Sequence, residues 1–76
     1  MNPRVIEVSP EDNYILKVKF KNGEVKFFDV SKYFDYEVYK PLQNKEYFQR
    51  AFVSHGTVGW PNDIDFDPDT IYLEAV

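Results

Sequence analysis

The chain carries a dense cluster of carboxylates near its C-terminal end, in an alternating run completed by a glutamate: Asp63, Asp65, Asp67, Asp69 and Glu74. Carboxylates in such a pattern are the ligands of a calcium loop, whose sixth position is a glycine that permits a sharp turn. Here that position is Pro68, which locks φ near about −65°. We therefore expect no metal site, and interpret the run as a turn followed by a capped helix start at Asp67-Pro68-Asp69.

The remaining residues with catalytic potential form no recognisable motif. His55 is the one histidine, and there is no cysteine. Ser54 precedes His55, but adjacent strand residues point to opposite faces of a sheet, so we expect no dyad. The three glycines do not form a phosphate-binding loop. We predict that the protein is not an enzyme and has no catalytic residues, metal or cofactor.

A hairpin is the strongest structural signal in the sequence. Residues 14–20 alternate apolar and lysine side chains, as a half-buried strand does. Asn22-Gly23 then favours a two-residue type I′ turn. Such a turn would pair Phe20 with Val25 and Val18 with Phe27 on the core face. The opposite face would carry a lysine ladder with one aromatic residue, which we call the lysine face: Lys17, Lys19, Lys21, Lys26 and Phe28.

Other signals place a few short elements around this hairpin. Residues 4–8 read as a strand that Pro10 ends. Asn44 is expected to cap a helix from residue 45 to about residue 51. Residues 52–54 and 57–60 predict a second hairpin turning at His55-Gly56. The expected fold is α+β, a small antiparallel sheet built from two hairpins (about four to five strands), with one short helix and a capped C-terminal turn.

Composition bounds the class of protein. The 76 residues leave room for a single domain, residues 1–76, and no stretch is long or apolar enough to span a membrane. With no signal peptide apparent, we expect a cytoplasmic protein that contacts no membrane. Aromatic residues make up 18% of the chain, as expected where a small core needs large side chains. Trp60 is expected to fill that core, with its indole N–H bonded to a carbonyl, and Asn22, Gly23 and Gly56 are expected to serve structural turns.

The net charge of −4 is unevenly distributed. Residues 1–50 hold nine basic and eight acidic residues, whereas residues 51–76 hold five acidic and no basic ones. The second part includes the segment from Asp63 to Asp69, which we call the acidic segment. The lysine face and the acidic segment are opposite in sign, so we regard both as candidate partner-binding surfaces.

Several short motifs resemble, in their order, the bacterial family known as domain of unknown function 2442. They lie at residues 16–24, 28–30, 39–42, 47–48, 60–65 and 68–72. The family usually has glycine after Trp-Pro-Asn, where this chain has Asp63, a residue type that tolerates the left-handed region. The resemblance implies a small α+β domain without established catalytic residues. The resemblance also implies that some longer members carry a helix-turn-helix domain and that short members are often encoded beside another small protein, which suggests toxin–antitoxin-like pairs.

Two functional hypotheses follow. In the first, the chain is a non-catalytic protein-interaction or regulatory module, the antitoxin-like half of a two-protein pair, whose partner is the product of a neighbouring gene or a second copy in a homodimer. In the second, it is part of a nucleic-acid-linked transcriptional regulator that uses the basic sheet face. The acidic net charge argues against nucleic-acid binding by this chain alone, since phosphate contacts need clustered lysine and arginine.

Overall fold

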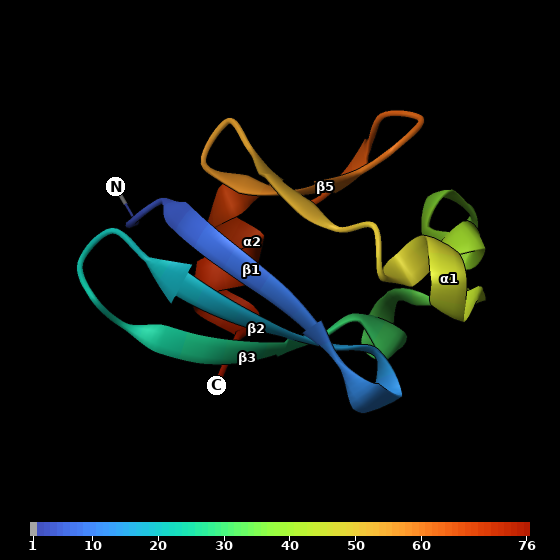
Figure 1. Ribbon diagram of the computed structural model, residues 1–76, viewed down its shortest axis with the longest axis horizontal. Coiled ribbons are helices and arrows are strands. Elements are labelled where there is room, and N and C mark those ends of the chain that lie inside the picture. Colours follow the sequence, from blue (N-terminus) through green and yellow to red (C-terminus); the bar gives the residue numbers. More distant parts are fainter. Residues whose placement is uncertain (1) are drawn as a thin grey trace.

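The computed structural model describes residues 2–76, which form six strands, two α-helices and three short 3₁₀ helices. Strands β1, β2 and β3 form one antiparallel sheet in that order, called sheet A, and β4, β5 and β6 form a second, called sheet B. In Figure 1 the strands of sheet A lie side by side, with β5 passing over them and α1 at one end. The strands are β1 Val5–Glu11, β2 Ile15–Phe20, β3 Val25–Asp29, β4 Phe52–Ser54, β5 Thr57–Trp60 and β6 Ile64–Asp65. The helices are η1 Asp12–Tyr14, η2 Val30–Tyr33, η3 Glu37–Gln43, α1 Lys45–Phe48 and α2 Pro68–Glu74.

The predicted α+β class, both hairpins and the capped C-terminal turn are confirmed, and the strands divide into two sheets of three. Asn44 caps α1, because its side chain accepts a hydrogen bond from the Tyr47 N–H at 3.1 Å. Asp67 caps α2 in the same way, accepting from the Asp69 N–H at 2.9 Å. The C-terminal turn is a helix of seven residues, while α1 ends at Phe48, before the expected residue 51.

Strand β1 runs further than expected. Pro10 lies within it, opposite Leu16 of β2, and the strand ends at Glu11. This is possible because β1 is an edge strand of sheet A, where a missing backbone N–H costs no ladder hydrogen bond. The extension brings Glu11 alongside β2, opposite Ile15.

The predicted register between β2 and β3 is wrong by one residue. Lys19 pairs with Val25 and Lys17 with Phe27, so that Val18 lies opposite Lys26. Gly23 has φ of 93°, but Asn22 does not have positive φ. The loop therefore has three residues, 21–23, closed by hydrogen bonds from Gly23 N–H to the Phe20 carbonyl and from Phe20 N–H to the Glu24 carbonyl. Three-residue loops of this kind end in one left-handed residue, usually glycine, whereas a type I′ turn needs two.

The second hairpin has the predicted turn. His55 and Gly56 have φ of 51° and 77°, as a two-residue type I′ loop requires. The turn also joins the two sheets, because the Gly56 carbonyl accepts a hydrogen bond from the Val5 N–H at 2.9 Å.

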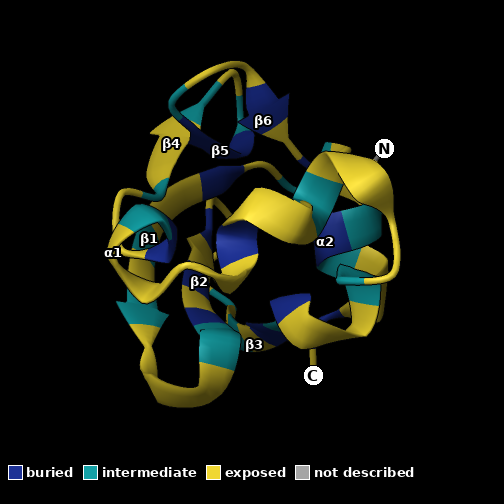
Figure 2. Ribbon diagram, turned by 90° about the vertical axis from the view of Figure 1, so that its right-hand side faces the viewer, coloured by how far each residue is buried: buried dark blue, intermediate teal, exposed yellow. Residues whose placement is uncertain are grey.

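The core lies between the two sheets and α2. In Figure 2 the residues coloured as buried lie on strands of both sheets and on α2. Trp60 is 1% exposed and donates its indole N–H to the Phe48 carbonyl at 3.0 Å, which confirms its predicted role as a core side chain. Within residues 2–76, no helix combines the length and the apolar character needed to cross a membrane.

Candidate functional site

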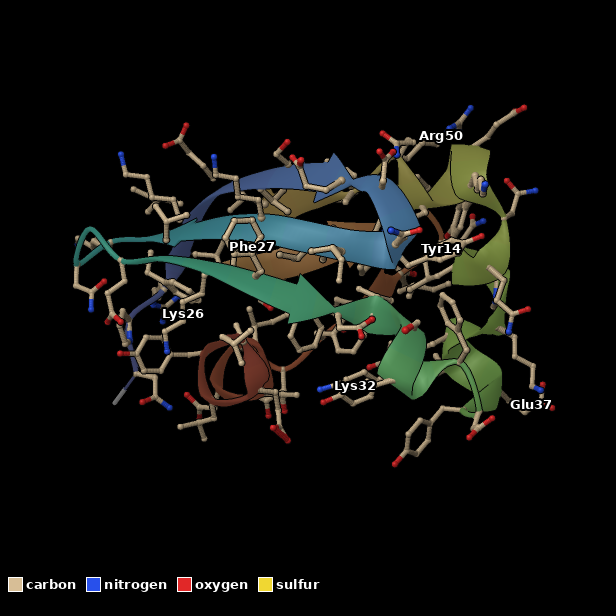
Figure 3. All side chains as sticks on the ribbon, turned by 90° about the horizontal axis from the view of Figure 1, so that it is seen from below. Tyr14, Lys26, Phe27, Lys32, Glu37 and Arg50 are labelled. Atoms are coloured by element: carbon tan, nitrogen blue, oxygen red, sulfur yellow. The ribbon has the colours of Figure 1, made fainter. Side chains whose placement is uncertain are left out.

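The outer face of sheet A is the candidate functional surface, and each of its strands contributes a different kind of side chain. On this face the β1 residues are acidic or polar, most of the β2 residues are lysines, and most of the β3 residues are apolar. Phe27 of β3 is labelled in Figure 3. The residues that make up this outer face are Glu7, Ser9, Glu11, Ile15, Lys17, Lys19, Val25, Phe27 and Asp29.

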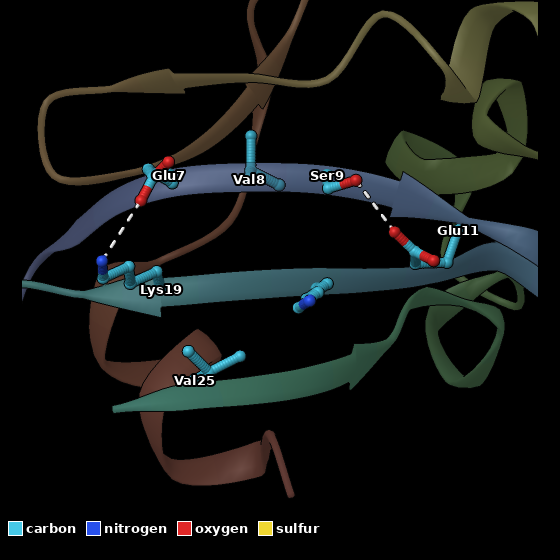
Figure 4. Close-up of a pocket in the computed structure, with 7 residues that line it drawn as sticks. Glu7, Val8, Ser9, Glu11, Lys19 and Val25 are labelled. Carbon is cyan, nitrogen blue, oxygen red and sulfur yellow. Dashed lines mark hydrogen bonds and ion pairs between the residues drawn. The ribbon is translucent and has the colours of Figure 1, made fainter. Parts of the chain in front are cut away.

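Cross-strand pairing places opposite charges together on this face. Glu7 lies opposite Lys19, and their Oε2 and Nζ atoms are 3.6 Å apart. Ser9 lies opposite Lys17 and donates its hydroxyl to a Glu11 carboxylate oxygen at 2.8 Å. The polar residues line a shallow hollow that extends to Val25 (Figure 4). Apart from Ser9, Ile15 and Asp29, the face is therefore a row of acids on β1, a row of bases on β2 and a row of apolar groups on β3.

Two apolar side chains on β3 remain partly open to solvent. Val25 is 47% exposed and Phe27 is 45% exposed, and each lies directly opposite a lysine of β2. A half-exposed aromatic ring beside charged neighbours has the composition of a protein-binding surface, in which aromatic groups are enriched and a polar rim surrounds them.

The predicted lysine face is broken up by the observed register. Lys17 and Lys19 lie on the outer face, and Lys21 lies in the turn between β2 and β3. Lys26 lies on the opposite face, because its cross-strand partner is the buried Val18. Phe28 was predicted to lie beside the lysines, but it is 1% exposed and belongs to the core.

Lys26 serves an intramolecular contact with α2. Its Nζ atom lies 3.8 Å from the centre of the Tyr72 ring and donates to the Tyr72 carbonyl at 3.2 Å. The Tyr72 hydroxyl in turn donates to a Glu24 carboxylate oxygen at 2.5 Å. That hydrogen bond, with a second from Asn22 and the nearby charge of Lys26, holds the pKa of Glu24 below its ordinary value. The same bond to Glu24 is the main reason why the pKa of Tyr72 is raised.

The residues of the acidic segment have separate local surroundings. Asp63 occupies a turn with φ of 62°, so it adopts the left-handed conformation expected where the family usually has glycine. Asp65 lies in β6, and Asp67 caps α2. Asp69 accepts a hydrogen bond from the Asn2 amide at 3.2 Å. Within residues 2–76, no three histidine, cysteine, aspartate or glutamate side chains are grouped so as to hold a metal ion.

The lysine face and the acidic segment do not meet within the chain. Among residues 2–76 the ion pairs are Lys19 with Glu7 and Lys26 with Glu24, and neither involves the acidic segment. Within residues 2–76 the acidic segment thus has hydrogen-bond partners but no ion-pair partner.

Ser54 and His55 do contact each other, contrary to expectation. The Ser54 Oγ and His55 Nδ1 atoms are 3.2 Å apart, because His55 lies in the turn rather than in a strand. The hydrogen bonds found for residues 2–76 give the His55 ring no carboxylate partner, so this pair lacks the group that orients the base in a catalytic triad.

Sequence reasoning missed Glu7, Glu11, Val25 and Phe27 as surface residues of this site. The pattern Val25-Lys26-Phe27-Phe28 permits either aromatic residue to face the core, so local alternation did not decide between them. The signal that could have decided is the single glycine of the loop, which is compatible with a three-residue turn.

Comparison with known proteins gives one match. The family model described as "Protein of unknown function (DUF2442)" matches residues 5–76. No curated protein and no solved structure matches the chain.

Proposed function

The chain belongs to the DUF2442 family of proteins of unknown function, and from that premise we propose that it is a non-catalytic protein-interaction module. Its contact surface is the outer face of sheet A, and its occupant is a dedicated protein partner. The observation that carries this proposal is the half-exposed Phe27, with Val25 beside it, next to rows of lysine and glutamate.

The arrangement supports a protein as the occupant. Interfaces draw most of their binding energy from a few buried anchors, among which aromatic residues are enriched, and a polar rim excludes water around them. Phe27 is the anchor in this proposal, and Lys17, Lys19 and Glu7 form part of the rim. Alternating charge also sets the orientation of a partner, because like charges placed opposite each other are unfavourable.

The family resemblance supports a partner dedicated to this chain. The resemblance implies that short members are encoded beside another small protein, which suggests a regulatory or antitoxin-like half of a two-protein pair. The product of the neighbouring gene is therefore the partner that we propose. It would present an apolar pocket for Phe27 and charges complementary to those of the outer face.

The nucleic-acid hypothesis finds no comparable support. The four lysines that it requires do not share one face, and Lys26 is occupied by Tyr72 and Glu24. Glu7 lies beside Lys19 and would repel phosphate groups.

The test is to express the chain with the product of the neighbouring gene, purify any complex, and measure its dissociation constant by calorimetry. Phe27→Ser should weaken binding by about tenfold or more, as expected for a central aromatic anchor. Phe52→Ser is the matched control, because Phe52 is also 45% exposed but lies on β4 of sheet B. Equal affinities for the wild type and Phe27→Ser would contradict the proposal, as would a larger loss in Phe52→Ser.

A second copy of the chain is the alternative occupant, and sedimentation of the isolated chain distinguishes it. A dimer that Phe27→Ser dissociates would make the partner another copy. A monomer that also fails to bind the neighbouring product would overturn the proposed function.

A further inference from the structure

Three tyrosines gather on a different part of the surface, where the chain passes from η2 into η3. The centres of the Tyr33 and Tyr36 rings are 6.1 Å apart, with the ring planes inclined by 29°. Tyr39 approaches both rings edge-on, at 6.1 Å from Tyr33 and 6.4 Å from Tyr36. We call Tyr33, Tyr36 and Tyr39 the tyrosine platform.

The platform rests on the core and is held in place by it. Tyr33 stacks on the buried Phe28, with ring centres 5.6 Å apart, and Tyr39 stacks on the buried Phe66 at 4.2 Å. The Tyr39 hydroxyl also donates to the Asp65 carbonyl at 3.0 Å. Tyr36 lies furthest from the core and is 59% exposed. The inner rings are therefore fixed, while the outermost offers much of its surface to solvent.

The surroundings of the platform are acidic. Asp35 and Glu37 flank Tyr36 in sequence and are exposed, and Figure 3 shows Glu37 pointing away from the body of the protein. Burial and the nearby charges of Asp65 and Asp67 raise the pKa of Tyr39. Among the ion pairs of residues 2–76, none involves these four carboxylates, although Asp67 also caps α2. No lysine or arginine of the described residues neutralises them through an ion pair.

A similar acidic group lies at the inner edge of the platform, but a lysine accompanies it. Burial and the charge of Glu74 raise the pKa of Tyr33. Glu74 and Asp29 share a small hollow beside Tyr33 with Lys32, which offsets part of their charge. Carboxylates therefore lie near both edges of the platform, and the ring most open to solvent is that of Tyr36 at the outer edge.

We propose that the tyrosine platform binds an arginine-containing basic segment of a partner protein. The guanidinium group stacks on the open ring of Tyr36, and Asp35 and Glu37 pair with its charge. The protein contains the same chemistry internally, where Lys26 lies over the Tyr72 ring beside Glu24. The platform involves no residue of the outer face of sheet A, so this inference stands independently of the proposed function.

The test is an NMR titration of the full-length ¹⁵N-labelled chain with a capped tetra-arginine peptide at low salt. A capped tetra-citrulline peptide is the neutral control. The amide signals of residues 33–39 should shift with tetra-arginine and not with tetra-citrulline, and the shifts should decrease as salt is added.

Variants then separate ring stacking from general attraction to an acidic protein. Tyr36→Ser should weaken binding about two- to fivefold, the loss expected for one exposed cation–π contact. Glu37→Gln should weaken it by a similar or smaller factor, because exposed charge pairs contribute little. Phe52→Ser and Glu46→Gln are the matched controls, since both residues are exposed and lie on other elements, and neither change should alter the affinity.

Three results would overturn the proposal. The first is the absence of shifts at residues 33–39, and the second is an unchanged affinity in Tyr36→Ser. The third is a loss in Glu46→Gln as large as that in Glu37→Gln, which would show attraction by net charge alone.

Discussion

The adjacent phenylalanines of β3 allow a sharp test of the observed strand register. Phe28 is 1% exposed and packs between Tyr33 and Phe66, whereas Phe27 is 45% exposed on the outer face of sheet A. A shift of one residue in the pairing of β3 would exchange the two side chains. Replacing each in turn should therefore have very different effects on stability.

The magnitudes follow from burial. Removing a fully buried phenylalanine side chain costs about 3–5 kcal/mol, because apolar contact is lost and a cavity remains. At Phe27 about half of the side-chain area is in contact with protein, and solvent fills the vacated space, so Phe27→Ala should cost about 1–2 kcal/mol. A domain of this length has a free energy of unfolding of about 4–11 kcal/mol. Phe28→Ala thus removes much of the stability, and Phe27→Ala removes little.

Urea unfolding followed by fluorescence of Trp60, the one tryptophan, measures both effects. Because Phe28→Ala could unfold the chain outright, leucine variants provide a second comparison. Phe28→Leu should cost about 1–2 kcal/mol, and Phe27→Leu about 0.5 kcal/mol or less. Equal losses at the two positions, or a larger loss at Phe27, would refute the assigned register and the surface built on it.

Two further predictions concern pH and the turn glycines. Tyr72→Phe should raise the pKa of Glu24 toward its ordinary value of 4.5, as NMR titration of that carboxyl would show. Because the pKa of Glu24 is lower in the folded state than in the unfolded state, the ionised carboxylate stabilises the fold at any pH above the unfolded-state pKa. This stabilisation is lost as the pH falls through the folded-state pKa, so the urea midpoints of the wild type and Tyr72→Phe should converge in acid. A difference in midpoint that stays constant with pH would contradict this prediction. Gly23→Ala and Gly56→Ala should each cost about 1–2 kcal/mol, because both glycines have positive φ. At Gly56 the added Cβ also lies 2.9 Å from Arg4 side-chain carbons, while at Gly23 it meets nothing. Gly56→Ala should therefore lower the free energy of unfolding in urea more than Gly23→Ala does, and Arg4→Ala should reduce the difference between the two losses. If Arg4→Ala leaves that difference unaltered, the contact with Arg4 is refuted.

Local features of the fold were predictable because they depend on neighbouring residues. Asn44 and Asp67 cap their helices through backbone groups two or three positions away. The His55-Gly56 turn follows from two residues that accept positive φ. Trp60 was correctly assigned to the core, since the largest apolar side chain of a small domain is best buried.

The candidate site was predicted only in part. Alternation along β2 correctly placed Lys17 and Lys19 together, since residues two apart in a strand share a face. It could not place Lys26, because the face of a β3 residue depends on the number of residues in the loop. The alternation along β2 also gave no reason to expect a contact between Lys26 and Tyr72, which lies 46 positions further along the chain.

The amino-acid sequence by itself determined the α+β class, the presence of both hairpins, the helix caps and the uneven distribution of charge. These properties depend on side-chain type and on contacts within a few residues. Only the tertiary structure decided which side of β3 faces outward. Phe27 and Phe28 are chemically identical, and what distinguishes them is the packing of Tyr33 and Phe66 against Phe28. The same packing turns Lys26 inward to Tyr72 and leaves Phe27 exposed, because a one-residue change of register moves every side chain of a strand to the other face.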